Sequence, residues 1–150
     1  PIRVRFTLPR GETGRQQPLV VTGQPHAGTF VYLRYEDERH VRLGVDVWGQ
    51  YAQLSDPIEA DYFAEHELIV NATGLYPDGH ALTSATPADR RDRLQVTLDG
   101  RLIVDHAVNA YPSKIGDVTV GLNRIGGSHC EPAFAGEILA VDRLPPGGRP

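Results

Sequence analysis

Apolar and polar residues alternate along most of the chain with a period of two. The clearest run covers residues 41–48, where Val41, Leu43, Val45 and Val47 alternate with polar residues or glycine. A period of two places the apolar side chains on one face of a β-strand. Further strand-like runs cover residues 2–8, 18–22, 29–36, 67–73 and 118–122. The pattern therefore predicts an all-β chain whose strands each bury one face.

The pair Asp99-Gly100 predicts a tight hairpin. It separates two short runs, residues 96–98 and 102–104, that begin and end on apolar residues. Asp followed by Gly tolerates the positive φ angles that a primed two-residue turn requires. We therefore expect two antiparallel strands joined at this pair.

Three pieces in the last third of the chain occur in a characteristic order. The hairpin at Leu98-Asp99-Gly100 is followed by Val118-Thr-Val-Gly-Leu-Asn123 and then by Phe134-Ala-Gly-Glu-Ile138. This order resembles the closing strands of the concanavalin A-like lectin/glucanase superfamily, especially its laminin G-like and pentraxin-like members. The resemblance implies a two-sheet antiparallel jelly-roll β-sandwich, with residues 134–138 as a strand at the sheet edge. About ten or more short strands suit that fold better than the roughly seven of an immunoglobulin-type sandwich.

Length and charge limit the functions to consider. The chain has 150 residues, of which 40% are hydrophobic and 23% charged, as in one globular domain. A net charge of −4 without a basic stripe argues against nucleic acid as a partner. No run approaches the roughly 20 apolar residues that cross a bilayer, so direct membrane insertion is not expected.

The ends of the chain suggest a piece of a longer protein. The sequence contains no Met and opens directly on a strand-like run, and residues 144–150 have the Pro/Gly-rich composition of a linker or tail. We therefore expect a domain over residues 1–143, attached to the rest of a parent polypeptide. The resemblance favours an extracytoplasmic or secreted protein.

The polar face of the run at 41–48 is the first candidate binding site. If the valines face the core, Arg42, Asp46 and Trp48 share the opposite face, and Tyr51 could extend it. An indole ring can stack on the apolar face of a pyranose while charged groups hydrogen-bond its hydroxyls. The alternative is that Trp48 covers the rim of the core and that Arg42 and Asp46 form an ion pair.

A polar, glycine-rich loop is the second candidate. Its candidate ligand contacts are Asn123, Arg124, His129 and Glu131. Related domains can hold calcium at such a rim, and Asn123, Glu131, Asp117 and Asp78 offer oxygen ligands. No contiguous acidic calcium loop is present and no two of the six histidines have zinc-ligand spacing, so we predict no metal site or cofactor and keep calcium only as an alternative.

Catalysis receives little support from the sequence. Laminarinase-type glycoside hydrolases of the superfamily place carboxylates as Glu-x-Asp-x-Glu, on one face of a strand. This chain has Glu59, Asp61 and Glu65, with the last carboxylate two residues too far along. The resemblance therefore implies a non-catalytic module that recognises carbohydrate or a cell-surface protein. A protein-interaction accessory domain and a divergent glycoside hydrolase remain as alternatives.

Overall fold

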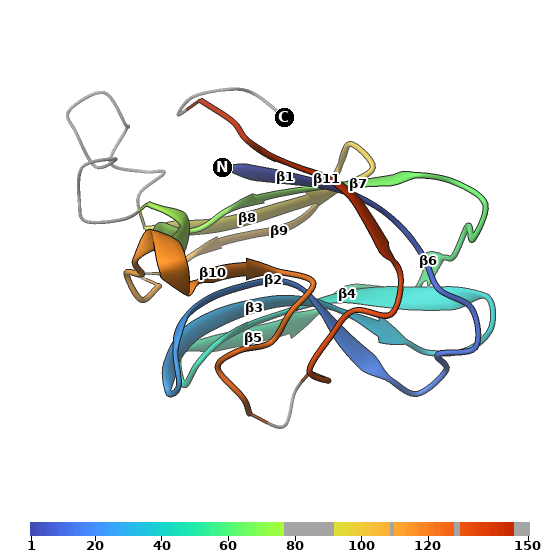
Figure 1. Cartoon of the computed structure of the whole chain (residues 1–150), viewed down its shortest axis with the longest axis horizontal. Helices are drawn as coiled ribbons and strands as arrows, with labels where there is room; N and C mark the ends of the chain where they lie inside the picture. Colours follow the sequence, from blue (N-terminus) through green and yellow to red (C-terminus); the bar gives the residue numbers. More distant parts are fainter. Residues whose placement is uncertain (77–91, 109, 128–129, 146–150) are drawn as a thin grey trace.

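A computed structural model describes residues 1–76, 92–108, 110–127 and 130–145. Almost all regular structure in these residues is β-strand (Figure 1). The strands are β1 (Ile2–Thr7), β2 (Gln16–Gln24), β3 (Ala27–Tyr35), β4 (His40–Val47), β5 (Tyr51–Leu54), β6 (Ile58–Glu59), β7 (His66–Asn71), β8 (Arg93–Leu98), β9 (Arg101–Ala107), β10 (Val118–Val120) and β11 (Glu137–Arg143). Two short 3-10 turns, η1 (Thr73–Leu75) and η3 (Ile115–Asp117), accompany them. No helix among the described residues has the length and apolar character to cross a membrane.

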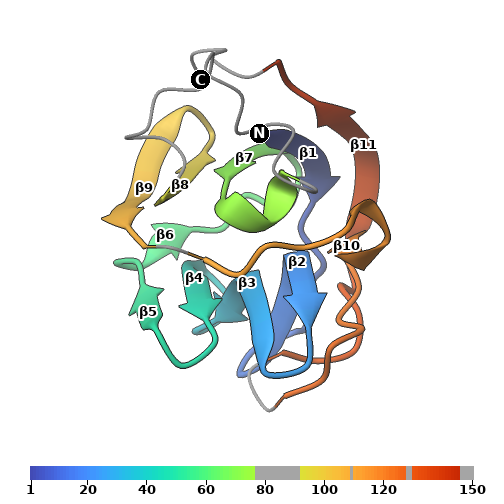
Figure 2. The ribbon, with the colours of Figure 1, turned by 90° about the vertical axis from the view of Figure 1, so that its left-hand side faces the viewer.

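The strands form two antiparallel sheets that pack face to face (Figures 1 and 2). The five-stranded sheet has the order β11-β1-β7-β8-β9. The six-stranded sheet has the order β10-β2-β3-β4-β5, and the short β6 also pairs with β4. This arrangement confirms the predicted two-sheet β-sandwich.

The core lies between the two sheets and follows the period-two pattern. Val41, Leu43, Val45 and Val47 of β4 are at most 2% exposed and belong to one apolar cluster with side chains of the facing sheet. Burying such a side chain fully contributes roughly 1.5–3 kcal/mol. The alternation read from the sequence therefore identifies which face of β4 is inside.

The hairpin between β8 and β9 has the turn that its sequence predicts. Asp99 and Gly100 both have positive φ, at 49° and 74°. The Asp99 carboxylate also ties the turn to β7, because its Oδ1 accepts a hydrogen bond from the Glu67 backbone N–H at 2.8 Å. Its Oδ2 lies 2.8 Å from Nδ1 of the buried His66 ring.

The edge strand predicted at residues 134–138 begins later than expected. β11 starts at Glu137 and pairs with β1. Phe134 is instead buried, with its ring edge-on to Phe6 at a centroid distance of 5.7 Å. Gly136 passes close to the Phe134 ring and to the Thr7 carbonyl, where a Cβ would not fit. The chain must therefore turn at Gly136 before it can join the sheet.

Residues 121–127 and 130–134 belong to the connection between β10 and β11, and are here called the covering loop. It passes over the outer face of the six-stranded sheet, which is the face turned away from the core. The Glu131 N–H donates to the Gln16 carbonyl at 2.8 Å, and the Phe134 N–H donates to the Gly121 carbonyl at 2.8 Å. The first of these bonds holds the covering loop against β2, and the second joins the two ends of the loop.

Candidate ligand-binding site

Arg42 lies on the outer face of the six-stranded sheet, and its guanidinium is already bound to residues that directly follow β3 and β5. Its Nε lies 2.9 Å from Oε1 of Glu36, and its Nη1 donates to the Ser55 carbonyl at 2.9 Å. Arg34 shares the same Glu36 oxygen at 3.3 Å. The ion pair of Arg42 is therefore with Glu36, and the alternative of an Arg42–Asp46 pair is not the contact seen here.

Asp46 lies further along the same face and is buried beneath the covering loop. The residue is 8% exposed and is close enough to Tyr32 and Cys130 for its charge to act on both. Burial raises the pKa of Cys130 to about 12, and the negative charge of Asp46 adds to the effect. Burial also raises the pKa of Tyr32, with further contributions from Cys130 and Asp46. The Asp46 carboxylate therefore makes a second negative charge beside it unfavourable.

Trp48 packs against a small apolar cluster on the outer face and keeps part of its surface exposed. The cluster consists of Val21, Phe30, Tyr32, Ile125 and Cys130. The indole ring is tilted against Phe30 and edge-on to the exposed His26, at centroid distances of 6.1 and 4.9 Å. The Tyr111 hydroxyl donates to the Trp48 carbonyl at 2.7 Å. Trp48 thus covers apolar side chains and also presents a partly open ring held in a fixed position.

Tyr51 lies on the opposite face of the sheet, contrary to the expectation that it extends the Trp48 surface. It pairs with Val47 in the β4–β5 register and therefore points toward the core side. Its ring stacks on His106 of β9 at 3.8 Å between centroids, with only 3° between the planes. Its hydroxyl donates to Gln53. Tyr51 joins the two sheets at their open edge.

Asn123 organises the covering loop from within. Its Nδ2 donates to the carbonyls of Gly126 and Cys130, both at 3.2 Å. Its Oδ1 accepts hydrogen bonds from the N–H groups of Ile125 and Gly126 at 3.2 and 3.0 Å. The donors and the acceptor of this amide are all hydrogen-bonded within the loop, so Asn123 would affect ligand binding only through the shape of the loop.

The other three predicted loop residues differ in their surroundings. Glu131 is held by Arg15 at 3.3 Å and by Gln17 at 3.5 Å. Arg124 is exposed and forms no ion pair with any residue that the structure describes. His129 lies outside the described residues. The structure therefore brings Asp46, Trp48 and the covering loop together, and Arg124 is an exposed cation on that loop.

The described residues give no separate support to the calcium alternative. Within these ranges no three His, Cys, Asp or Glu side chains lie close enough to hold a metal ion. Asp117 accepts a hydrogen bond from the Lys114 N–H at 3.3 Å, at the start of η3. Asp78 lies outside the described residues.

The three carboxylates considered for catalysis serve different local contacts. Glu65 pairs with Arg5 at 3.0 Å on the five-stranded sheet. Oδ1 of Asp61 accepts a hydrogen bond from the Phe63 N–H at 2.9 Å. Glu59 is exposed on β6, in the other sheet.

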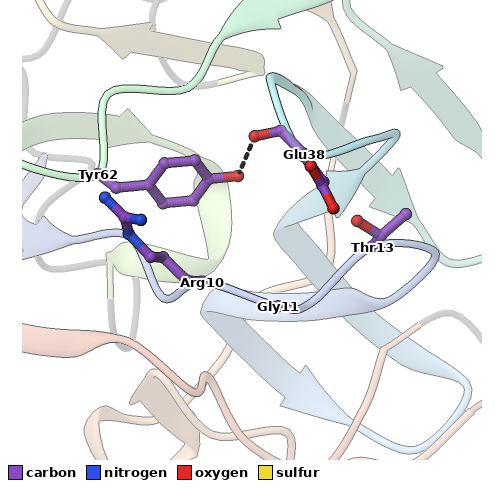
Figure 3. A pocket seen from close by; sticks show the side chains of 5 residues that line it. All are labelled: Arg10, Gly11, Thr13, Glu38 and Tyr62. Atoms are coloured by element: carbon purple, nitrogen blue, oxygen red, sulfur yellow. Dashed lines mark hydrogen bonds between the residues drawn. The ribbon is translucent and has the colours of Figure 1, made fainter.

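A pocket that the sequence did not predict lies at the other end of β4 (Figure 3). It has a volume of about 560 Å³ and is lined by Arg10, Gly11, Thr13, Glu38 and Tyr62. Its residues come from three separate loops, so no local pattern could assemble them. The sequence did offer one signal, the adjacent aromatic pair Tyr62-Phe63 in a polar segment. In the structure Phe63 is 88% exposed.

Comparison with known proteins identifies the fold. No protein-family model matches the chain, and no curated protein matches it. The solved structures that are similar to it include a pentraxin and a carbohydrate-binding module. The SAP-like pentraxin from Limulus polyphemus has a TM-score of 0.54 and 13% identity, over 93% of this chain and 60% of the pentraxin chain. The CBM40 of a Ruminococcus gnavus IT-sialidase, solved with alpha2,3 sialyllactose, has a TM-score of 0.52 and 14% identity, over 93% of this chain and 76% of the module. This chain has the concanavalin A-like lectin fold, as the order of its closing strands implied.

Proposed function

We propose that this domain is a non-catalytic module that binds carbohydrate on the outer face of its six-stranded sheet, beside Trp48. The observation that carries the proposal is the indole ring of Trp48, which is partly exposed and braced by the covering loop. A ring fixed in this way can stack on the C–H face of a pyranose at little cost in conformational entropy. The CBM40 solved with alpha2,3 sialyllactose shares the fold and supports a sugar as the ligand class.

The residues that would contact the sugar follow from their positions. Trp48 would supply the stacking surface and Arg124 the exposed hydrogen-bond donor. Asp46 is buried beneath the covering loop, so we assign it a supporting role, and His129 remains a candidate from the sequence alone. Arg42 and Glu131 are tied up in ion pairs, so we assign them a supporting role.

The test is a glycan panel that includes α2,3-sialyllactose and neutral oligosaccharides, with calcium and with a chelator. Trp48 is the single tryptophan of the chain, so its fluorescence reports directly on the proposed site. Saturable binding that changes this fluorescence would support the proposal, and loss of binding with chelator would add a metal ion to the site.

Two variants separate binding from folding. Arg124→Ala removes an exposed side chain and should weaken binding about tenfold, which corresponds to roughly 1.4 kcal/mol. Arg39→Ala is the matched control, because Arg39 is also an exposed arginine but sits in the turn before β4. Trp48→Ala should abolish binding while the β-sheet circular dichroism spectrum is retained. Unchanged affinity in Arg124→Ala and in folded Trp48→Ala would reject this site, and silence across the panel would favour a protein-interaction domain.

A further inference from the structure

The pocket formed by Arg10, Gly11, Thr13, Glu38 and Tyr62 lies far from Trp48. Glu38 is in the turn between β3 and β4, and Trp48 directly follows the other end of β4. The seven residue steps from His40 to Val47 span roughly 23 Å at about 3.3 Å per step. The two regions are therefore separate sites.

Hydrogen bonds hold the loops around this pocket in place. The Tyr62 hydroxyl donates to the Glu38 carbonyl at 3.0 Å, as Figure 3 shows, and the Ala60 N–H donates to the Arg39 carbonyl at 2.8 Å. The Asp61 carbonyl lies 2.7 Å from Nε2 of the buried His66 ring. The pocket is therefore formed before any ligand arrives, which reduces the entropy lost on binding.

Phe63 lies beside the pocket, in contact with the pocket residue Arg10. Its ring is almost fully exposed even though the loop that carries it is fixed. The Arg10 guanidinium lies 4.7 Å from the centroid of this ring and 5.6 Å from that of Tyr62. Exposing a large apolar ring is unfavourable in water, and this ring supports no part of the core. Its placement is explained if it contacts a ligand.

The pocket has two charged groups of opposite sign, of which Arg10 also lies against the rings of Phe63 and Tyr62. Neither the Arg10 guanidinium nor the Glu38 carboxylate is ion-paired with a described residue, and the Thr13 hydroxyl faces the same space (Figure 3). Because the pocket has one positive and one negative group, its net charge is zero and it does not favour a charged ligand. A neighbouring pair of hydroxyls satisfies both groups, since one hydroxyl accepts from Arg10 and the other donates to Glu38.

The geometry points to a second binding site, at this end of the sandwich, for a neutral saccharide with vicinal hydroxyls. Its hydroxyls bond to Arg10, Glu38 and Thr13, and the C–H face of its ring packs on Phe63. The polar lining disfavours an apolar peptide side chain, which needs a hydrophobic pocket. This inference stands on the pocket itself and does not require the Trp48 site to exist.

The experiment is a titration of the whole domain with neutral di- to tetrasaccharides of glucose, galactose and mannose, followed by NMR of assigned backbone amides. We expect saturable shifts at residues 10–13, 38 and 60–63 for at least one of them, with no change in Trp48 fluorescence. Phe63→Ala should weaken this binding about tenfold, and Glu38→Gln should weaken it by a similar factor. Ile115→Ala and Glu137→Gln are the matched controls, because they remove an exposed apolar side chain and an exposed charge elsewhere.

The possible results are distinguishable from those of the Trp48 test. Shifts in the pocket with silent Trp48 fluorescence support the second site, whatever the outcome at the first. No pocket shift with any neutral saccharide overturns the inference, and so does binding that tolerates both Phe63→Ala and Glu38→Gln. Pocket shifts that appear only with a carboxylated sugar or with a peptide also overturn it. Because Phe63 is exposed, loss of fold is not expected to obscure its variant.

Discussion

Gly44→Ala is the sharpest test of the packing on the outer face. Gly44 pairs with Tyr32 across β4 and β3, and the Tyr32 ring lies directly over it. A Cβ added at this position would lie 2.2 Å from Cζ and 2.4 Å from Cε2 of that ring. Contacts this short do not occur in folded proteins, so the ring must move. The ring is only 5% exposed and packs in the same cluster as Trp48, so it has little room to do so.

The expected cost follows from the behaviour of overpacked cores. Forcing an extra methyl group into a filled site costs roughly 1–3 kcal/mol of unfolding free energy. For a chain of this length each kcal/mol lowers Tm by roughly 2–4 °C, so we expect a decrease of roughly 2–12 °C. Urea unfolding followed by Trp48 fluorescence gives the free energy, and circular dichroism on heating gives Tm. The native fluorescence should shift as well, because Tyr32 and Trp48 share one cluster.

Two further variants isolate the cause. Gly116→Ala is the control, because a Cβ there meets no atom within 4 Å and the backbone has no positive φ. It should change the unfolding free energy by less than about 0.5 kcal/mol. In the double variant Tyr32→Ala/Gly44→Ala the clash is absent, so the two single costs should not add. A Gly44→Ala protein as stable as Gly116→Ala, or additive costs in the double variant, would refute this account of the outer face.

Two other predictions concern buried polar groups. Because burial and the Asp46 charge raise the pKa of Cys130 to about 12, its thiolate fraction at pH 8 should be on the order of a thousandfold below that of an ordinary thiol; iodoacetamide should label it slowly in the native state and rapidly in urea. Between about pH 9 and pH 12 the Cys130 thiol ionises in the unfolded state but not in the folded state, so the free energy of unfolding should fall as pH rises through this range. Below about pH 9 the thiol is protonated in both states and has no such effect. Cys130→Ala should therefore lose less stability than the parent protein between about pH 9 and pH 12. Equal labelling rates in native and unfolded protein would contradict this view. Asp99→Ala removes the acceptors for Glu67 and His66 and places alanine at positive φ, so it should lower the unfolding free energy by roughly 2–4 kcal/mol; Asp99→Asn, which tolerates that φ, should cost less, and equal urea midpoints for the two would argue against a role for the turn conformation.

The sequence predicted the fold well wherever a pattern was local. The alternation in β4 identifies its buried face because the side chains of a strand point alternately to the two sides of the sheet. The Asp99-Gly100 turn was readable because few residue pairs tolerate two successive positive φ angles. The order of the closing strands indicated the superfamily fold, although the exact start of β11 depended on the buried Phe134 and the close approach at Gly136.

The candidate site was harder to predict because its contacts cross between segments. Tyr51 was expected beside Trp48 because it follows that residue closely in the sequence. The chain instead reverses at Gly49, whose φ is 72°, and the Gln50 N–H donates to the Val47 carbonyl. The pairing of Tyr51 with Val47 then decides its face. The Glu36 partner of Arg42 and the covering loop over Trp48 likewise depend on tertiary placement.

The covering loop explains why two regions far apart in sequence act as one candidate surface. Its shape is held by the four hydrogen bonds of Asn123, none of which involves a side chain of the sheet. The loop can therefore keep its form without a ligand, and the apolar side chains of Ile125 and Cys130 attach it to Phe30 and Trp48. A sugar at Trp48 would meet a surface that is already ordered, so most of its contact energy would appear as affinity. The same reasoning applies at the other end of β4, where separate hydrogen bonds fix Tyr62 and Phe63. The fold thus offers two preformed surfaces at the two ends of one central strand.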